Sequence, residues 1–258
     1  MPFHSSYAAE RILQGPHDVR PDSSDALQFL CEAEMGDGWL HPNSSNYTFV
    51  VELVWGECRG FGVYKPRVGE APLWDFPPGT LYQRECAAFE LSRLLGWGMV
   101  PPTVLREGAA GPGSLQLYVP PVEDSNYFTL RDAHREDAIR MAVFDIAANN
   151  ADRKGGHCFV AECGGVWGID HGLTFNADHK LRTVIWDFAG EQVPQALLDD
   201  LCGLEHAFQA QGMLALGRLP ELLHPQELEA LSRRIRALAE TPVFPVPTNR
   251  RDIPWPWL

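Results

Sequence analysis

Hydrophobic residues dominate two neighbouring segments in the first third of the chain, with few polar positions between them. Residues 47–55 (Y-T-F-V-V-E-L-V-W) and 61–66 (F-G-V-Y-K-P) are rich in β-branched and aromatic residues, and a turn sequence separates them. This pattern predicts an antiparallel hairpin. Lys65 then lies at the end of its second strand, and Ser44, Ser45 and Asn46 lie at the start of its first.

After a loop rich in Pro and Gly at residues 67–79, hydrophobic residues recur at the spacing of an α-helix. A helix is predicted over residues 79–95, with one face formed at spacings of three and four by Leu81, Glu85, Ala88, Ser92 and Leu95. A carboxylate that faces a core is costly without a cation, so Glu85 calls for a buried partner, and Lys65 is the natural candidate. The alternative is that Glu85 lies at the edge of the stripe and reaches water.

The pattern changes from strands to helices near residue 120. Residues 114–119 form the last expected strand of this part, and Pro120 and Pro121 end it and stiffen the connection. Residues 135–149 then predict a helix buried on both sides. Further helices are expected near residues 194–204 and 225–239.

We therefore predict an α+β fold of two lobes joined by a hinge. Residues 1–119 would form an N-lobe with an antiparallel sheet and one main helix, and residues 120–258 a mainly helical C-lobe. In the weakly patterned first forty residues, a short helix is expected at 25–33 and a G-D-G turn at 36–38.

Composition narrows the class of protein. A chain of 258 residues with 45% hydrophobic content can bury a sizeable core. A formal net charge of −13 works against binding nucleic acid or anionic lipid, which carry charge of the same sign. No apolar run is long enough to span a membrane, and the N-terminus lacks a signal pattern, so we expect a cytoplasmic protein.

The six cysteines are scattered without C-x-x-C spacing, and we expect reduced, mostly buried thiols. An alternative is a zinc-stabilised interaction domain with ligands from His157, Cys158, Cys163 and His171. Alternating strand positions argue against it, because they point neighbouring ligands to opposite faces.

Two motifs in the second half carry the chemistry. N-A-D-R-K-G-G-H ends at His157, and I-D-H-G contains Asp170; a Gly-Gly turn between them predicts a tight hairpin that brings Asp170 back beside His157. Each residue alone could be an ordinary turn residue. Their order after a lysine strand and a glutamate helix is what phosphoryl transfer from ATP requires.

The roles follow from that reaction. Asp152 would accept or orient the proton of the acceptor hydroxyl, and Asp170 would hold Mg²⁺ with His157 as a second ligand. Lys65 would contact the nucleotide phosphates and Glu85 would hold Lys65 in place. Backbone amides around Ser44, Ser45 and Asn46 would cradle phosphate oxygens.

Residues 44–198 resemble, motif by motif, the phosphatidylinositol 3-/4-kinase superfamily, and most closely the type II phosphatidylinositol 4-kinases and their small bacterial relatives. S-S-N-Y-T-F is similar to the family's phosphate loop, G-V-Y-K-P to its lysine strand and R-E-C-A-A-F-E-L to its glutamate helix. L-Q-L-Y-V is similar to its hinge, and the two motifs above to its catalytic loop and metal motif. The resemblance implies a protein-kinase-like fold.

It also implies the Lys65–Glu85 ion pair, Asp152 as catalytic carboxylate and Asp170 as principal metal ligand. The hinge that contacts adenine would run from Gln116 through Leu117 to Val119. The chain departs from the family at His157, where the family usually has Asn, and at Lys154. An imidazole is a softer ligand than oxygen, which leaves room for Mn²⁺ in place of Mg²⁺.

The acceptor is expected to be a hydroxyl of a protein or small molecule. Type II lipid kinases carry a cysteine-rich palmitoylated insert between the lysine and glutamate motifs, whereas this chain has E-A-P-L-W-D-F-P-P-G. Trp74 and Phe76 of that loop either form a lip on the acceptor side or pack against the lobe. A phosphatidylinositol kinase, an ATP-binding pseudokinase and a transferase of AMP remain alternatives.

Overall fold

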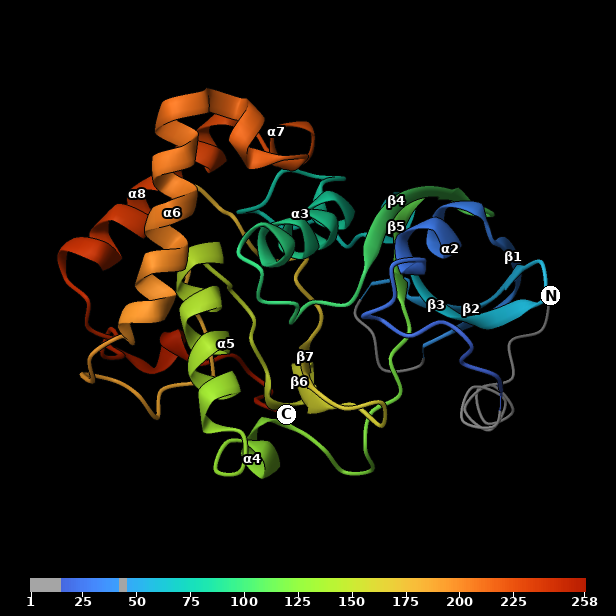
Figure 1. Cartoon of the computed structure of the whole chain (residues 1–258), viewed down its shortest axis with the longest axis horizontal. Helices are drawn as coiled ribbons and strands as arrows, with labels where there is room; N and C mark the ends of the chain where they lie inside the picture. Colours follow the sequence, from blue (N-terminus) through green and yellow to red (C-terminus); the bar gives the residue numbers. More distant parts are fainter. Residues whose placement is uncertain (1–14, 42–45) are drawn as a thin grey trace. The chain divides into compact units, whose positions relative to one another are not determined.

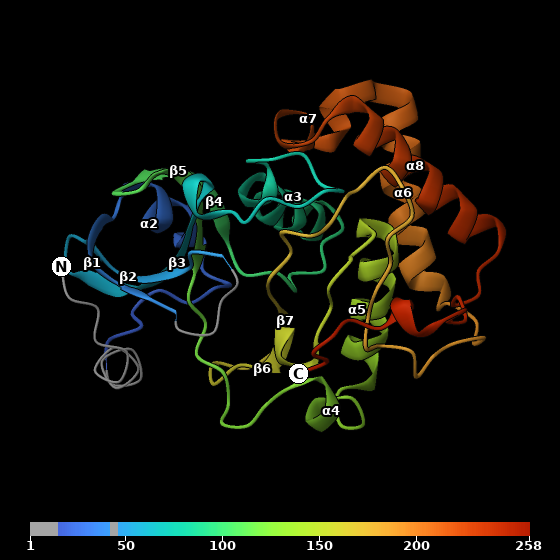
Figure 2. The same ribbon diagram turned by 180° about the vertical axis from the view of Figure 1, so that it is seen from behind.

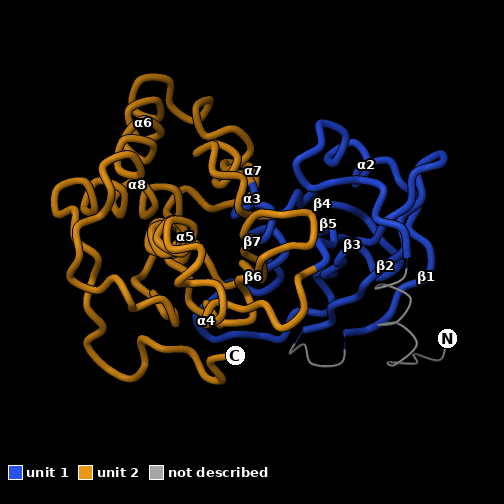
Figure 3. Tube along the Cα trace, turned by 60° about the horizontal axis from the view of Figure 1, so that its bottom comes forward, with its two compact units in different colours: residues 1–89, 101–120 blue, residues 90–100, 121–258 orange. Residues whose placement is uncertain are grey.

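The computed structural model describes residues 15–41 and 46–258, and the chain divides into two compact units (Figure 3). The first unit comprises residues 1–89 and 101–120, and the second comprises residues 90–100 and 121–258. The expected lobes were 1–119 and 120–258, so the stretch Glu90–Val100 lies with the second unit instead of the first. Its contacts explain this, because the Glu90 carboxylate accepts the Arg218 N–H at 3.0 Å and the Met99 carbonyl accepts the Gly168 N–H at 2.7 Å.

The first unit is built on a five-stranded antiparallel sheet (Figure 1). Its strands are paired in the order β1-β2-β3-β5-β4. The predicted hairpin is confirmed as β2 and β3, whose registers pair Phe49 with Tyr64 and Trp55 with Cys58. The bounds of the strands are β1 Glu34–Leu40, β2 Phe49–Trp55, β3 Cys58–Pro66, β4 Thr103–Gly108 and β5 Gly111–Leu117.

The G-D-G sequence at residues 36–38 lies inside β1, so the predicted turn is wrong there. The pairing of β1 with β2 shifts register between Met35 and Gly38. This irregularity accommodates the two glycines within a strand, because a bulge adds residues without breaking the pairing on either side.

One face of the sheet is covered by α2 (Ala26–Glu32), which confirms the short helix expected there. Alternate positions of β2, β3 and β5 point to this helix, because successive side chains of a strand face opposite sides. The resulting core contains Phe29, Leu30, Leu53, Tyr64, Val104, Leu115 and Leu117.

The 3-10 turn η1 (Arg67–Gly69) opens the loop after β3, and α3 (Leu81–Leu94) follows the loop. The predicted helix of residues 79–95 is confirmed within two residues at each end. All five residues of its expected stripe are buried, Leu81, Glu85, Ala88, Ser92 and Leu95.

The second unit is mainly helical, as predicted. Helix α5 (Arg135–Ala148) is buried on both sides, and α8 (Pro225–Glu240) packs against both α5 and α6 (Gln195–Gln211), as Figure 2 shows from behind. Of the helices in the described ranges, none combines the length and apolar composition that a membrane span requires. The shorter elements are α4 Tyr127–Leu130, η3 Gly212–Leu216, α7 Leu219–Leu222 and η4 Arg250–Asp252.

The predicted hairpin between the two motifs is present. After η2 (Gly155–His157), strand β6 (Cys158–Val160) pairs with β7 (Val166–Gly168). Gly164 and Gly165 form the turn with φ of 94° and 81°, a backbone region that glycine enters without steric cost. The short turn fixes the two ends of the hairpin next to each other.

All six cysteines are free thiols, as expected. Only Cys86 and Cys158 are buried, so the expectation of mostly buried thiols is wrong. The other four lie on partly or fully exposed positions of helices, strands and turns.

Candidate active site

Lys65 and Glu85 form an ion pair within the first unit, between the end of β3 and the middle of α3. The Glu85 side chain is 4% exposed and the Lys65 side chain is 21% exposed. Glu85 is therefore buried with its cation, as predicted, and the alternative of a water-exposed Glu85 is wrong. The pairing offsets the cost of burying the carboxylate and fixes the direction of the lysine.

Lys65 lies on the face of the sheet opposite α2. Tyr64 packs in the core beneath α2, so the neighbouring positions 63 and 65 face the other side. Val63 is directly opposite Gln116 in the β3–β5 pairing, which places Gln116 on the same face as Lys65. The Gln116 amide nitrogen donates to the Thr103 hydroxyl at 2.9 Å and is thereby held in place.

The expected hinge follows Gln116. The side chain of Leu117 packs in the core beneath α2, so only its backbone could face a nucleotide. The N–H groups of Leu117 and Tyr118 donate to the carbonyls of Pro102 and Phe61, both at 2.9 Å. The N–H of Val119 donates to no partner within the described part of the chain, so this hinge donor is unused there.

The expected phosphate loop is described only in part. Ser44 and Ser45 lie outside the described residues. The Asn46 side-chain oxygen accepts the Ala71 N–H at 2.7 Å, and the Tyr47 N–H donates to the Gly69 carbonyl at 3.0 Å. Asn46 thus fastens the start of β2 to the loop that follows β3.

In the second unit, the catalytic loop begins where α5 ends. Asn149 caps the helix in the left-handed conformation, with φ of 54°, and its side-chain amide donates to the carbonyls of Asn176 and Asp178 at 2.9 and 2.6 Å. Asn150 donates to the Asp145 carboxylate at 2.9 Å, and its side-chain oxygen accepts the Asp152 N–H at 3.0 Å. The two asparagines therefore hold the backbone that presents Asp152.

The Asp152 carboxylate is partly buried, with the Lys154 ammonium 3.1 Å from its Oδ2 atom. Burial raises the pKa of Asp152 above its usual value, the charge and hydrogen bond of Lys154 lower it, and the charge of Asp170 raises it. The net direction is upward, because burial outweighs the attraction of Lys154.

Arg153, between these two residues, is fully buried and was not identified from the sequence. Its guanidinium contacts both oxygens of the buried Asp145 carboxylate at 2.9 to 3.1 Å. Its Nη1 atom donates to the carbonyls of His157 and Ile169 at 3.2 and 3.0 Å. One side chain thus binds the residues at both ends of the β6–β7 hairpin. The signal in the sequence was Asp145, a carboxylate in the middle of a buried helix, which requires a cation as Glu85 does.

His157 and Asp170 lie together, as the hairpin predicted. The Nε2 atom of His157 is 3.3 Å from the Asp170 Oδ2 atom, and its Nδ1 atom accepts the Lys154 N–H at 3.4 Å. A neutral imidazole with Nδ1 as acceptor carries its proton on Nε2 and donates to Asp170. To bind a metal, the Nε2 atom would have to lose that proton. Asp170 has φ of 60°, and its side chain is 48% exposed.

Asp152 and Asp170 supply oxygen donors, which are the ligands that a hard divalent cation prefers. The mutual repulsion of Asp152 and Asp170 contributes to the raised pKa of Asp152, and a cation between such groups would relieve it. Within residues 15–41 and 46–258, no three His, Cys, Asp or Glu side chains are arranged to hold a metal alone. Mg²⁺ commonly takes only one or two protein carboxylates, with phosphate oxygens completing its shell.

The alternative zinc site fits poorly. Cys158 is buried, and burial raises the pKa of its thiol to about 12, which disfavours the thiolate that zinc requires. The Nε2 atom of His171 lies 2.7 Å from the Arg153 guanidinium instead of facing the other candidate ligands.

Comparison with known proteins supports the kinase-like fold. No protein-family model matches the chain. The chain is 40% identical over 250 residues to protein Rv2133c of Mycobacterium tuberculosis, across 83% of this chain and 88% of that protein. In structure it is similar to the Helicobacter pylori proinflammatory kinase CtkA, with a TM-score of 0.50 over 83% of this chain and 94% of that one, at 11% identity. At this identity the likeness establishes the fold alone.

Proposed function

Since the chain belongs to the family of the Mycobacterium tuberculosis protein Rv2133c and has a kinase-like fold, we propose that it is an ATP-dependent kinase of the phosphatidylinositol 3-/4-kinase-like type. The observation that carries the proposal is the Lys65–Glu85 ion pair. A buried carboxylate needs its cation, but packed apolar residues in place of a buried ion pair are often as stable or more stable, so stability alone does not explain the pair. Their use lies in aiming a lysine of fixed direction at phosphate oxygens.

Each residue then has a role in phosphoryl transfer. Lys65 neutralises charge on the α and β phosphates, and the Val119 N–H donates to the base. Asp152 orients the acceptor hydroxyl and takes its proton, for which it must be ionised. Asp170, with His157, would hold Mg²⁺ or Mn²⁺, and the bound cation supplies charge neutralisation at the phosphates.

The acceptor in this proposal is a hydroxyl of a protein or a small molecule. The loop after β3 has no cysteine for lipid anchoring, and the net charge of −13 opposes an anionic membrane surface. A phosphatidylinositol kinase is therefore the less favoured form of the same proposal.

A second candidate function is ATP binding without catalysis. The position of His157 favours it, because an imidazole nitrogen 3.3 Å from the Asp170 carboxylate competes with a cation for that carboxylate. The raised pKa of the Asp152 carboxyl supports catalysis, because perturbed pKa values are concentrated at catalytic sites.

The test is turnover of labelled ATP with Mg²⁺ or Mn²⁺, read as ATP hydrolysis and as added mass on the protein or on components of a cell extract. We expect Lys65→Met and Asp152→Asn to lower the rate about 100-fold or more. Arg59→Met, an exposed position of β3, serves as the matched control and should leave the rate unchanged.

The outcomes separate the candidates. An added mass of one phosphate supports the kinase, whereas an added AMP identifies a nucleotidyl transferase. The kinase proposal fails if wild type and Asp152→Asn both bind ATP and neither hydrolyses it or modifies any acceptor. That result would identify a pseudokinase.

A further inference from the structure

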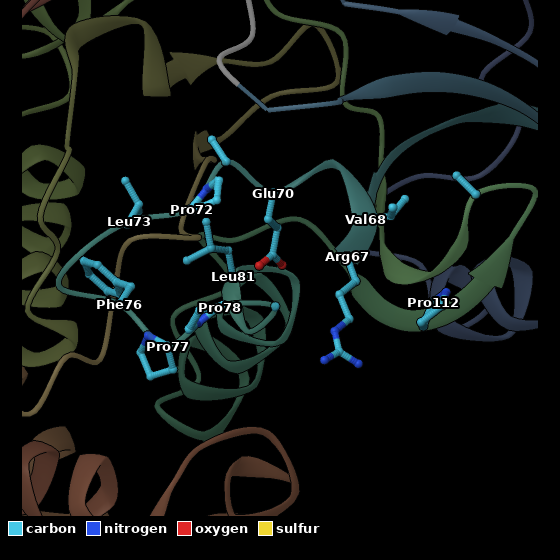
Figure 4. A pocket seen from close by; sticks show the side chains of 13 residues that line it. Arg67, Val68, Glu70, Pro72, Leu73, Phe76, Pro77, Pro78, Leu81 and Pro112 are labelled. Atoms are coloured by element: carbon cyan, nitrogen blue, oxygen red, sulfur yellow. The ribbon is translucent and has the colours of Figure 1, made fainter.

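A cavity of about 490 Å³ lies within the first unit, between the loop after β3, the first turn of α3 and the β4–β5 turn. We call it the loop cavity, and its walls include Arg67, Glu70, Leu73, Phe76, Leu81 and Pro112 (Figure 4). Neither Lys65 nor Glu85 lines it. Its volume falls in the range of sites that bind small ligands or inserted side chains.

The apolar wall of the cavity is fixed in place. Phe76 is buried beneath the Arg84 guanidinium, which lies 5.0 Å from the ring centre, and Leu81 is buried at the start of α3. Phe76 therefore packs against its own unit, which is the second of the two alternatives predicted from the sequence. A rigid apolar wall favours an apolar group as the occupant, because little ordering is needed when it binds.

Two polar groups of opposite charge also line the cavity. One Glu70 oxygen accepts the Tyr82 N–H at 2.9 Å, whereas its Oε2 atom is buried and has no hydrogen-bond partner among residues 15–41 and 46–258. A buried acceptor without a donor is unfavourable, because it has lost its hydrogen bonds to water and gained none in the protein. A donor such as a backbone N–H from a ligand would remove that cost.

Arg67 supplies the positive group. Its side chain lies against Gly79, so closely that a Cβ atom there would be 2.5 Å from the Arg67 Nε atom. Within the described ranges the Arg67 guanidinium makes no hydrogen bond or ion pair, and the residue is exposed. It is therefore available to a carboxylate of a ligand.

The apolar surface continues beyond the cavity. Val68 at its edge is 72% exposed, and Trp74, which follows the lining residue Leu73, is 90% exposed. Large exposed apolar side chains beside a cavity indicate an occupant larger than the cavity itself. This favours a polypeptide over a small molecule.

We propose that the loop cavity binds an extended peptide segment of a partner protein, in which a large apolar side chain is followed by a carboxylate. The apolar side chain enters between Phe76 and Leu81, a backbone N–H donates to Glu70, and the carboxylate pairs with Arg67. Among the described residues, none of those assigned to ATP chemistry lines this cavity.

The probe is an acetylated and amidated tetrapeptide, Ala-Phe-Asp-Ala, titrated into the isotope-labelled full chain without ATP. We expect amide shifts at Gly79, Tyr82 and Ala110. Replacing the phenylalanine of the peptide by alanine should weaken binding at least about tenfold. Replacing its aspartate by lysine should weaken binding about fivefold.

Arg67→Glu should reverse this preference, so that the lysine peptide binds more tightly than the aspartate peptide. Arg59→Glu makes the same change of charge elsewhere in the unit and should leave the preference unchanged. A reversal is a gain of binding, which damage to the fold cannot produce.

Three results would overturn the proposal: no shifts at the cavity amides, an unchanged preference in Arg67→Glu, or binding of 3-phenylpropanoate as tight as that of the tetrapeptide. The last would identify a small-molecule site. Because the titration contains no nucleotide, failure of the kinase proposal would leave its outcome unaffected.

Discussion

The contact between Asp152 and Lys154 determines the charge of the proposed base. Burial raises the pKa of Asp152, and the ammonium 3.1 Å away is the main influence that lowers it. Asp152 must be ionised to accept a proton, so activity is lost as the pH falls through its pKa. Lys154 therefore keeps the base ionised at lower pH.

We predict that Lys154→Met raises the pKa of Asp152 further, because it removes the nearest positive charge. The acid limb of the kcat/KM profile should then move to higher pH, with the greatest loss of activity below neutrality. The measurement is the pH dependence of ATP turnover. Lys154→Arg keeps the charge, so its acid limb should lie close to that of the wild type. If the acid limb of Lys154→Met coincides with that of the wild type, Lys154 does not lower the pKa of Asp152.

At the scale of elements, Arg153 joins α5 to the β6–β7 hairpin. Asp145 on the helix and the carbonyls of His157 and Ile169 at the hairpin ends all bind the same guanidinium. The relative placement of Asp152 and Asp170 thus depends on a side chain that need not touch substrate. We regard Arg153 as a positioning residue.

We predict that Arg153→Met lowers the free energy of unfolding by about 3 to 5 kcal/mol, because it leaves the Asp145 carboxylate buried without its cation. Denaturant unfolding of the full chain measures this cost. Arg233→Met, at an exposed position of α8, is the control and should change stability by less than about 0.5 kcal/mol. Replacing Asp145 by Asn in the same chain should recover part of the loss, and full additivity of the two changes would refute the coupling.

At the scale of the whole molecule, the proposed kinase needs residues from both units. Lys65 and Glu85 belong to the first and Asp152 and Asp170 to the second. The proposed function gives residues of each unit a part in handling ATP. Binding of the nucleotide, as distinct from turnover, tests this requirement directly.

We predict that ATP with Mg²⁺ stabilises the chain by about 2.7 kcal/mol at a concentration of 100 times Kd, seen as a higher midpoint of thermal unfolding. Lys65→Met and Asp170→Asn should each reduce the shift, although they lie in different units. Asp152→Asn should retain it, because that carboxylate acts on the acceptor. A shift that either Lys65→Met or Asp170→Asn leaves unchanged would contradict the role proposed for that residue.

Much of the fold and of the proposed site followed from local patterns. The β2–β3 hairpin, α3, α5 and the β6–β7 hairpin are specified by periodicity and short turns within one stretch of chain. The nearness of His157 to Asp170 required only that hairpin. The pairing of Lys65 with Glu85 followed from one carboxylate on an apolar stripe, because burial of a charge leaves few other solutions.

The remaining features depend on contacts between distant residues. The glycines of β1 form a strand because β2 lies alongside, and Leu117 faces the α2 core because the sheet register fixes its side. The loop cavity exists because residues 67–81 fold against the β4–β5 turn. The sequence by itself determined which residues could perform phosphoryl chemistry, since charge and local periodicity are properties of short segments. Only the tertiary structure decided that Arg153 is buried between helix and hairpin, and that Phe76 is covered while Trp74 is exposed, because burial depends on which distant segments meet.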